Sequence, residues 1–483
     1  MSLTRGEMLA AARARDASYN GRFLTGVLST GIYCLPSCPA RPPKEENIRF
    51  FAGPVEARAA GLRPCKRCRP DDYLAGYDPD VEIAATLARR VRAHPEKVPD
   101  VAALGRAAGL GRTSLTDLVR RQFHSTPAAW LQRERLVAVR RNLLSSRRRI
   151  ADLALEAGFE SLSTFNDNFR RATGMCPGDY RLLAAEQSFV VALPRDFQHR
   201  LTLSFIGRDP ASPTERVEGK RIVRALCLDD SPCLLHIELS PGAATCRLEA
   251  PKPVSPRGMA EAHAVTLRLL GLIVDPKPFE RRLGRNKNHS GLVAGRHGLR
   301  LPQTAEPFEG LVWSIVGQQV NLAFAFALRQ RLVALAGTRA ESNGAGLLVH
   351  PDPASVARLD YRDLTRLQFS RRKAEYLIDA ARALAGGEIA LDSLATAPAG
   401  RVEKVLLGIR GIGPWSARYV MMRAFAFADC VPVGDSGLRT ALASYFALDH
   451  RPERRETEAL MAEFSPYRSL ATFHLWTSLG ACA

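Results

Sequence analysis

Two short stretches, Cys34-Leu35-Pro36-Ser37-Cys38 and Cys65-Lys66-Arg67-Cys68, decide the fold of the first part of this chain. Each places two thiols a few residues apart, and a modest loop separates the two pairs. Zinc prefers four tetrahedral ligands, and such a set folds a small module without a large apolar core. The alternative, two structural disulfides, requires an oxidising compartment that nothing else in the sequence indicates. We therefore expect one Zn²⁺ ion bound by Cys34, Cys38, Cys65 and Cys68.

The composition of the whole chain indicates its class of partner. Among 483 residues, 68 are Lys or Arg and 49 are Asp or Glu, which gives a formal net charge of +19. This basic field favours a polyanion, with nucleic acid ahead of an anionic membrane. No stretch reaches the roughly 18 apolar residues that would span a bilayer, and residues 1–16 lack the apolar region of a signal peptide. We expect a cytoplasmic protein that binds DNA and no membrane.

The sequence pattern changes three times along the chain, and its length also exceeds what one apolar core supports. Residues 1–77 are rich in Pro, Gly and Arg and carry the four cysteines, whereas residues 78–185 have apolar residues at helical spacing. Residues 187–297 contain short strand-like runs, and residues 298–483 return to amphipathic helical patterns, such as 308–335. The expected fold is multidomain and mainly α with α+β parts. Its four domains are a small zinc module, a tandem helix-turn-helix domain, an α+β domain with an antiparallel sheet, and an all-helical domain.

The second domain contains two helix-turn-helix patterns, at residues 101–123 and 150–169. In each, an apolar helix meets a Gly turn and is followed by a helix with polar and basic residues on its free face, the layout that places a second helix in a major groove. The alternative is a plain helical bundle with a polar surface. Ser, Thr and Arg side chains donate to phosphates and base edges alike. The candidate DNA contacts include Arg112, Thr113, Ser163 and Thr164.

Two such units in tandem, followed by Gly174-Met175-Cys176-Pro177-Gly178-Asp179-Tyr180-Arg181, resemble the DNA-binding domain of AraC-type transcription factors. The resemblance covers about residues 78–185. It implies sequence-specific binding to double-stranded DNA at promoters, and it leaves RNA polymerase open as a further partner.

With that neighbour, the cysteine module also resembles a known domain. Residues 30–41 and 63–68 are similar to the N-terminal zinc domain of the Ada adaptive-response family. The resemblance implies that Cys34 takes a methyl group from a methylphosphotriester of the DNA backbone, and that this switches on DNA binding. A zinc-bound thiolate is a competent nucleophile at neutral pH. The alternative is an inert zinc knuckle.

The third informative stretch is Leu407-Gly408-Ile409-Arg410-Gly411-Ile412-Gly413-Pro414-Trp415-Ser416-Ala417. Gly411 and Gly413 form a Gly-x-Gly turn, whose amides can approach a phosphate closely. Such a turn alone is often only a tight helix–helix connection. Together with the stretch 431–439 that surrounds Asp435, it resembles the helix-hairpin-helix-GPD DNA glycosylases, and within them the AlkA-type 3-methyladenine DNA glycosylase II. This resemblance extends over nearly the whole of residues 187–483.

The glycosylase resemblance implies roles for particular residues. Asp435 stabilises the developing oxocarbenium ion and orients the attacking water, as one carboxylate can do in glycosidic hydrolysis. Its alternative role is an N-cap of the following helix. The target base has to leave the stack, and π faces bind a cationic base well. The expected base pocket comprises Trp415, Tyr419, Trp476 and, by a looser match, Phe205.

Three further expectations follow from the resemblance. Bifunctional members have a Schiff-base lysine where this chain has Trp415, so a monofunctional enzyme without lyase chemistry is expected. Gln319 stands where the AlkA group wedges an apolar side chain into the duplex. Backbone carbonyls of residues 409–413 are candidates to bind a monovalent cation. The competing function is a transcription regulator whose glycosylase-like half is only a DNA clamp.

Overall fold

A computed structural model describes residues 3–16, 19–340 and 346–480 of the chain. The chain divides into two units, Met1–Ile83 and Ala84–Ala483. Within the described residues, no helix has the length and apolar character needed to cross a membrane.

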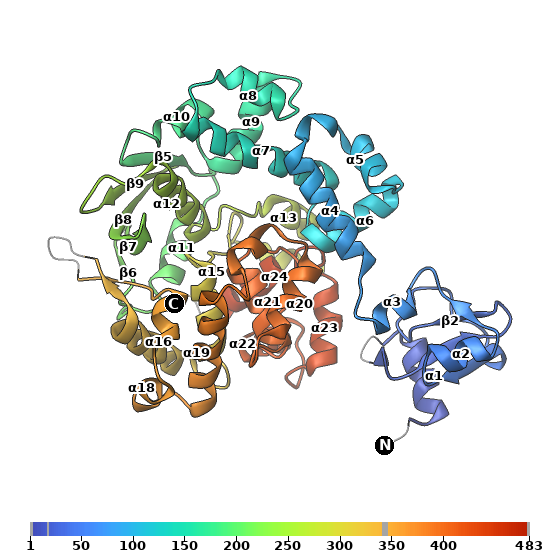
Figure 1. Ribbon diagram of the computed structural model, residues 1–483. Helices are drawn as coiled ribbons and strands as arrows, with labels where there is room; N and C mark the ends of the chain where they lie inside the picture. The colour runs from blue at the N-terminus through green and yellow to red at the C-terminus, as the bar shows by residue number, and fades with distance from the viewer. Residues whose placement is uncertain (1–2, 17–18, 341–345, 481–483) are drawn as a thin grey trace. The chain divides into compact units, whose positions relative to one another are not determined.

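The first unit is organised around a four-stranded sheet of order β3-β1-β2-β4 (Figure 1). The inner strands pair in antiparallel fashion, whereas β2 and β4 are parallel. The strands are β1 (Leu24–Val27), β2 (Ile32–Cys34), β3 (Ile48–Phe51) and β4 (Arg63–Pro64). Short helices accompany them: α1 (Arg5–Arg13), η2 (Glu45–Asn47), α2 (Pro54–Ala59) and α3 (Pro70–Leu74). The apolar core contains only a few side chains, among them Tyr33 and Phe51, so a metal staple fits a module of this size.

The second unit begins with helices that include both helix-turn-helix patterns. Asp100 and Ser161 cap α5 and α9 by accepting backbone N–H bonds, and Gly109 and Gly158 adopt positive φ after α5 and α8. The elements are α4 (Pro79–Ala93), η3 (Pro95–Lys97), α5 (Val101–Ala108), α6 (Arg112–Phe123), α7 (Pro127–Ser145), α8 (Ile150–Glu156), α9 (Leu162–Thr173) and α10 (Pro177–Leu182).

A five-stranded antiparallel sheet of order β5-β9-β8-β7-β6 follows, as the short apolar runs predicted. Along β9, buried and exposed positions alternate, which gives this strand one face in the core. Helix α12 contacts β7 (Figure 1). The elements are β5 (Ser188–Ala192), α11 (His199–Ile206), β6 (Glu215–Glu218), β7 (Arg221–Leu228), β8 (Ser231–Ser240), β9 (Ala243–Glu249) and α12 (Pro256–Leu269).

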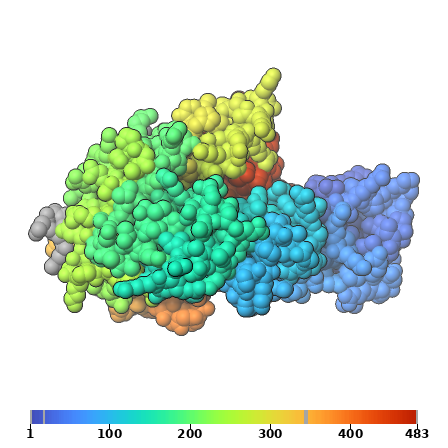
Figure 2. Space-filling view, turned by 90° about the horizontal axis from the view of Figure 1, so that it is seen from above, coloured from blue at the N-terminus to red at the C-terminus, as the bar shows by residue number. Residues whose placement is uncertain are grey.

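One apolar core continues from the helix-turn-helix segment into the sheet, joining α7–α10 to β5, β7–β9 and α12. The Ala192 N–H donates to the Gly174 carbonyl oxygen at 2.8 Å, and His263 Nε2 lies 2.7 Å from the Thr173 carbonyl oxygen. In Figure 2 the two segments form one continuous surface. The helix-turn-helix segment before residue 186 and the sheet after it are therefore packed together around one apolar core.

The remaining helices form the largest apolar core, which also receives Phe205 from α11. Their bounds are α13 (Lys277–Gly284), α14 (Ser290–Val293), α15 (Pro307–Val316), α16 (Leu322–Ala336), α17 (Pro353–Ala357), α18 (Tyr361–Arg366), α19 (Arg371–Ala385), η4 (Leu391–Thr396), α20 (Ala399–Gly408), α21 (Pro414–Arg423), α22 (Ser436–Tyr445), α23 (Arg454–Ala462) and α24 (Arg468–Ser478), with a short hairpin of β10 (Thr338–Arg339) and β11 (Leu348–Val349).

The helical pattern of residues 308–335 is interrupted, which the sequence did not reveal. Helix α15 ends at Val316 and α16 begins at Leu322, and Gln319 between them has φ +54°. The left-handed conformation costs free energy for a non-glycine residue, and it turns the chain so that Gln319 is exposed.

The first helix-turn-helix unit also contacts the C-terminal helices. The Asp429 N–H donates to His124 Nδ1 at 3.0 Å, and the Gly400 N–H donates to Gln122 Oε1 at 3.1 Å. Burial lowers the pKa of His124 to about 4, so it remains neutral and accepts this bond at neutral pH.

Candidate functional site

The four predicted cysteines meet at one point of the first unit. Their Sγ atoms all lie within 4.8 Å of one another, and Cys38 Sγ and Cys65 Sγ are 4.0 Å apart. Parallel pairing of β2 with β4 brings Cys34 next to Cys65, because Tyr33 lies opposite Pro64 and each is followed by a cysteine. Cys38 and Cys68 follow them a few residues later in the two loops. A tetrahedral site with Zn–S bonds of about 2.3 Å separates its sulfurs by about 3.8 Å. The four thiols therefore fit one zinc ion.

Backbone N–H groups surround the sulfurs. The Leu35 N–H donates to Cys68 Sγ at 3.3 Å, and the Arg67 N–H donates to Cys65 Sγ at 3.4 Å. Such donors stabilise negative charge on sulfur. Cys34 itself is 8% exposed, while the neighbouring Lys66 and Arg67 are exposed cations available to a phosphate backbone.

The candidate DNA-binding residues of the two helix-turn-helix segments lie on the protein surface. Arg112 and Thr113 open α6, and Ser163 and Thr164 lie in the first turn of α9; all four are exposed. The buried faces of these helices carry apolar side chains such as Leu115 on α6. Both second helices thus present polar N-terminal turns to solvent.

The Gly-x-Gly turn connects α20 to α21. Gly411 has φ +88°, and a Cβ atom there would lie 2.3 Å from the ring of Tyr376, so this position requires glycine. Gln318 Nε2 donates to the Gly411 carbonyl oxygen at 2.9 Å and to Ser416 Oγ at 3.1 Å. These bonds attach the segment before Gln319 to the turn. The first-turn amides of α21 follow Gly413, which is exposed.

The carbonyl groups of residues 409–413 were predicted to bind a monovalent cation. Three of them already accept hydrogen bonds: Ile409 from the Ile412 N–H, Gly411 from Gln318, and Gly413 from the Ala417 N–H. A carbonyl oxygen has two lone pairs, so the arrangement neither requires nor prevents a cation, and the site stays a prediction.

Asp435 lies between two tryptophans. Its Oδ2 accepts from Trp415 Nε1 at 3.2 Å, and its Oδ1 accepts from Trp476 Nε1 at 3.1 Å. Oδ1 also accepts from the Leu438 N–H at 2.8 Å, so Asp435 is the N-cap of α22. The rings of Trp415 and Tyr419 stack with centroids 5.6 Å apart, and those of Tyr419 and Trp476 are 6.4 Å apart. The structure brings these four predicted residues together around one carboxylate.

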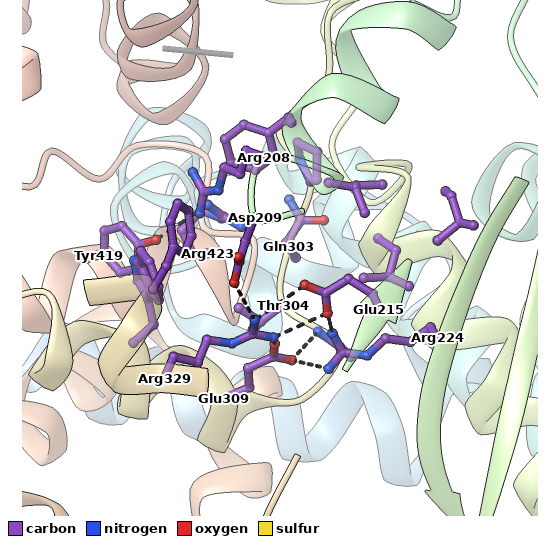
Figure 3. A pocket seen from close by; sticks show the side chains of 18 residues that line it. Arg208, Asp209, Glu215, Arg224, Gln303, Thr304, Glu309, Arg329, Tyr419 and Arg423 are labelled. Atoms are coloured by element: carbon purple, nitrogen blue, oxygen red, sulfur yellow. Dashed lines mark hydrogen bonds and ion pairs between the residues drawn. The ribbon is translucent and has the colours of Figure 1, made fainter. Parts of the chain in front are cut away.

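Tyr419 is also part of the wall of a pocket, and Phe205 lines the same pocket (Figure 3). The pocket and its open mouth together hold about 680 Å³ of empty space. Phe205 is 4% exposed, and its ring meets Phe473 edge-on at 5.0 Å. The guanidinium carbon of Arg208 lies 4.2 Å from the Phe205 centroid, and that of Arg423 lies 4.7 Å from it. Phe205 therefore contacts cations in this structure.

A buried ion-pair cluster forms the opposite wall of the pocket (Figure 3). Glu309 pairs with Arg224 at 2.8 Å and with Arg329 at 3.0 Å, and Glu215 pairs with both arginines. Burial opposes ionisation of Glu215, but the two arginines outweigh it and hold its pKa below the ordinary value. The cluster joins β6 and β7 to α15 and α16, and so fixes the sheet against the helices.

Two residues near the site, Arg423 and Lys373, were not among the predicted site residues. Arg423 follows Tyr419 by one helical turn on α21, a spacing that could have indicated a shared face. Lys373 donates from Nζ to the Val316 carbonyl oxygen at 2.7 Å, and burial lowers the pKa of its ammonium group. No local pattern signals that contact, because 57 positions separate its partners.

Comparison with known proteins matches three parts of the chain to family models. Residues 7–71 match the metal-binding domain of Ada, residues 104–182 a helix-turn-helix domain, and residues 312–466 the HhH-GPD superfamily of base excision DNA repair proteins. A probable bifunctional transcriptional activator/DNA repair enzyme AlkA from Mycobacterium tuberculosis is 30% identical over 97% of this chain and 95% of its own length. The chain belongs to this family of AlkA-type bifunctional proteins.

Two further similarities concern the C-terminal part of this AlkA-type protein. A DNA-3-methyladenine glycosylase of Bacillus subtilis is 29% identical over 60% of this chain and 96% of its own length. The solved 3-methyladenine DNA-glycosylase from Archaeoglobus fulgidus aligns with a TM-score of 0.53 and 21% identity, covering 60% of this chain and 97% of the other. The latter likeness shows a shared fold. The family, the domains and the cysteine cluster together assign DNA binding and one zinc site to this AlkA-type protein.

Proposed function

We propose that this AlkA-type protein repairs alkylated DNA and regulates the response to that damage. In this proposal residues 1–77 accept methyl groups, residues 78–185 bind promoters and contact RNA polymerase, and residues 187–297 with 298–483 excise alkylated purines such as 3-methyladenine. The observation that carries it is the Asp435 carboxylate held by two indole N–H groups beside Tyr419.

Base excision uses that carboxylate electrostatically. An N3- or N7-alkylated purine is already a good leaving group, so the enzyme mainly has to stabilise positive charge developing on the sugar. Asp435 supplies the negative charge and orients water, whose oxygen adds to C1′ as the base departs with the bonding electrons. The carboxylate of Asp435 takes the proton that the water loses, and the cationic base leaves as a neutral molecule. Trp415, Tyr419 and Trp476 supply aromatic faces for the flipped base. Since Trp415 occupies the place of a Schiff-base lysine, no lyase step follows.

Asp435→Asn tests the excision role with little effect on folding, because Asn caps a helix about as well as Asp. We expect base release from alkylated DNA to fall at least about a hundredfold, the scale of losing one charge-stabilising group, while duplex binding persists. The side chain of Asp449 is 98% exposed, so Asp449→Asn is the matched control. Undiminished release by Asp435→Asn would refute the assignment. A wild-type protein that binds DNA but releases no base would instead favour the clamp function.

Methyl transfer uses Cys34 as the acceptor. When bound, Zn²⁺ keeps the thiol ionised at neutral pH. The Cys34 sulfur attacks the methyl carbon of a methylphosphotriester, an S–C bond forms, and the C–O bond breaks with its electrons left on the phosphodiester oxygen. Methylation removes one negative charge from the cysteine cluster and so strengthens its contact with phosphates. Exposed Lys66 and Arg67 support this placement of DNA.

Mass spectrometry of the full-length protein after incubation with methylphosphotriester DNA, followed by digestion to locate the modified residue, tests the acceptor. We expect one added methyl group on Cys34, none in Cys34→Ala, and normal methylation in Cys227→Ser, a control at an exposed cysteine outside the cluster. A Cys34→Ala protein that still gains a methyl group on the zinc module would contradict the proposal.

A further inference from the structure

The loop between α21 and α22, which ends at Asp435, is fastened to the start of α24. The carboxylate of Asp429 in this loop accepts from Arg468 Nε at 2.7 Å and from Arg468 Nη2 at 2.9 Å. Ser465 Oγ donates to the same carboxylate at 2.9 Å. Helix α24 begins at Arg468 and carries Trp476, whose indole N–H donates to Asp435. Asp429 therefore connects the two segments that meet at the Asp435 carboxylate.

The helix-turn-helix segment holds the same loop by its backbone. The Asp429 N–H donates to His124 Nδ1 at 3.0 Å, and the rings of His124 and Phe427 meet edge-on with centroids 5.1 Å apart. His124 is the C-cap of α6 and has φ +49°. Asn, Asp and His adopt this left-handed conformation more readily than other residues with side chains. The loop is thus fixed at Asp429 by two elements, its carboxylate by α24 and its N–H group by α6.

Further contacts join the helix-turn-helix segment to the start of α20, the helix that precedes the Gly-x-Gly turn. Gln122 Oε1 accepts from the Gly400 N–H at 3.1 Å in the first turn of α20. Pro398, the N-cap of α20, makes no side-chain cap hydrogen bond, so buried Gln122 does for one first-turn N–H what a cap residue usually does. Arg92 on α4 donates from Nη2 to the Thr396 carbonyl oxygen at 2.9 Å.

We infer that α6 positions the base-excision site, with His124 and Gln122 as positioning residues for excision although both belong to the helix-turn-helix segment. The inference rests on the proposed base-excision function and assigns control of that site to a second segment of the chain. Helix α6 holds both the loop that ends at Asp435 and the helix that leads into the turn at Gly411. Packed interiors transmit small displacements, and a misplacement of about 1 Å can cost roughly a hundredfold in rate.

Two substitutions at one position, His124→Ala and His124→Asn, test the hydrogen bond in the full-length protein. Alanine removes the acceptor. Asparagine keeps one, because its Oδ1 is attached to Cγ as the Nδ1 of histidine is, and it tolerates the left-handed conformation. Base release is measured in single turnovers on DNA that contains 3-methyladenine, with the protein in saturating excess. The rate constant then reports the chemical step and does not depend on the fraction of folded protein.

We expect the single-turnover rate constant to fall about fivefold or more in His124→Ala, the scale of one neutral hydrogen bond. His124→Asn should stay within about twofold of the wild type. The protein concentration that gives half the maximal rate should change less than the rate constant, because the substitution displaces the loop of Asp435 and removes no contact with DNA.

Gln122→Met tests the inference at a position with ordinary helical geometry. It keeps an unbranched stem and removes the acceptor of the α20 contact, so we expect a fall of about threefold or more in the same rate constant. His94→Ala is the matched control, because His94 is an exposed histidine of the same segment. It should release base at the wild-type rate.

Wild-type rate constants in both His124→Ala and Gln122→Met would overturn the inference, as would a loss in His124→Asn as large as in His124→Ala. An equal loss in His94→Ala would overturn it too. Each of these results leaves base excision by the wild-type protein intact, so the proposed function would stand. Absence of base release by the wild-type protein would instead refute the proposed function, and the inference with it.

Discussion

Asp435 combines two tasks in one carboxylate. As the N-cap of α22 it is held by the Leu438 N–H, and the indole groups of Trp415 and Trp476 bind its two oxygens. Three donors restrict its rotation. In the proposed excision reaction, the carboxylate is therefore oriented before a substrate arrives, which reduces the reorganisation that the reaction requires. We therefore expect the indole N–H groups of both tryptophans, and not only their aromatic rings, to contribute to the rate of base release.

A double variant, Trp415→Phe with Trp476→Phe, keeps both aromatic faces and removes both N–H donors. A hydrogen bond to a charged group contributes about 1.5–3 kcal/mol, so we expect base release to fall about tenfold or more with little change in folding. Trp130→Phe is the control, because the buried Trp130 Nε1 has no hydrogen-bond partner among the described residues. Wild-type rates in the double variant would show that the donors do not position Asp435.

At the scale of elements, the conformation of the turn between α20 and α21 depends on a glycine at position 411. Gly411 has a positive φ and faces the ring of Tyr376 on α19. Gln318 ties its carbonyl group to the segment that carries Gln319. The turn, the segment of the exposed glutamine and α19 therefore support one another, and we propose that this surface contacts a DNA backbone.

Gly411→Ala should distort this turn. The left-handed conformation costs roughly 1–2 kcal/mol for a residue with a Cβ, and Tyr376 would also have to move. We expect weaker binding to undamaged duplex DNA, measured by fluorescence anisotropy, and a lower melting temperature of the second unit. Gly408→Ala is the control, since a Cβ there meets nothing within 4 Å. Equal DNA affinity for both variants would contradict a role of the turn in phosphate binding.

At the scale of the whole molecule, burial lowers the pKa of four histidines among the described residues of the second unit and so keeps them neutral at neutral pH. Their pKa values are lowered to about 4 for His124, His263 and His350 and to about 3 for His474. His124 and His263 lie where the helix-turn-helix segment meets the rest of the unit. A fall in pH is therefore expected to weaken the contacts between the helix-turn-helix segment and the rest of the second unit.

The sign of this effect follows from proton linkage. An unfolded histidine takes up a proton below about pH 6.5 and the folded one does not, so stability is full above that pH and falls as pH decreases toward 4. Each histidine costs about 2 kcal/mol at pH 5. Burial raises the pKa of Glu306 to about 7, and protonation of this carboxyl in the folded state opposes the trend by about 2 kcal/mol.

We therefore expect the free energy of unfolding of the second unit, measured with denaturant, to be several kcal/mol lower at pH 5 than at pH 7.5. His263→Gln should make this pH dependence shallower, even if it lowers stability at both pH values. His94→Gln changes an exposed histidine and should leave the slope unaltered. If the free energy of unfolding of His263→Gln depended on pH as steeply as that of the wild type, the linkage would be contradicted.

The sequence predicted those parts of the molecule that depend on short-range spacing. The two cysteine pairs indicated the metal cluster, the Gly turns indicated both helix-turn-helix units, and the apolar runs indicated the antiparallel sheet, all of which the structure and family models confirm. The break at Gln319 was missed, since the apolar spacing continues across it and only a left-handed residue interrupts the helix.

By itself, then, the sequence determined the module types and the four cysteines of the metal cluster, and it predicted Asp435 as the catalytic carboxylate. Each of these residues lies in a motif whose spacing is set by neighbouring residues. Only the tertiary structure decided what surrounds them. Trp476 donates to Asp435 across 41 positions, and Arg208 and Arg423 each lie over the ring of Phe205, within 4.7 Å of its centroid. Such contacts arise when elements distant in the chain pack together, and no local pattern of residues encodes which side chains then face one pocket.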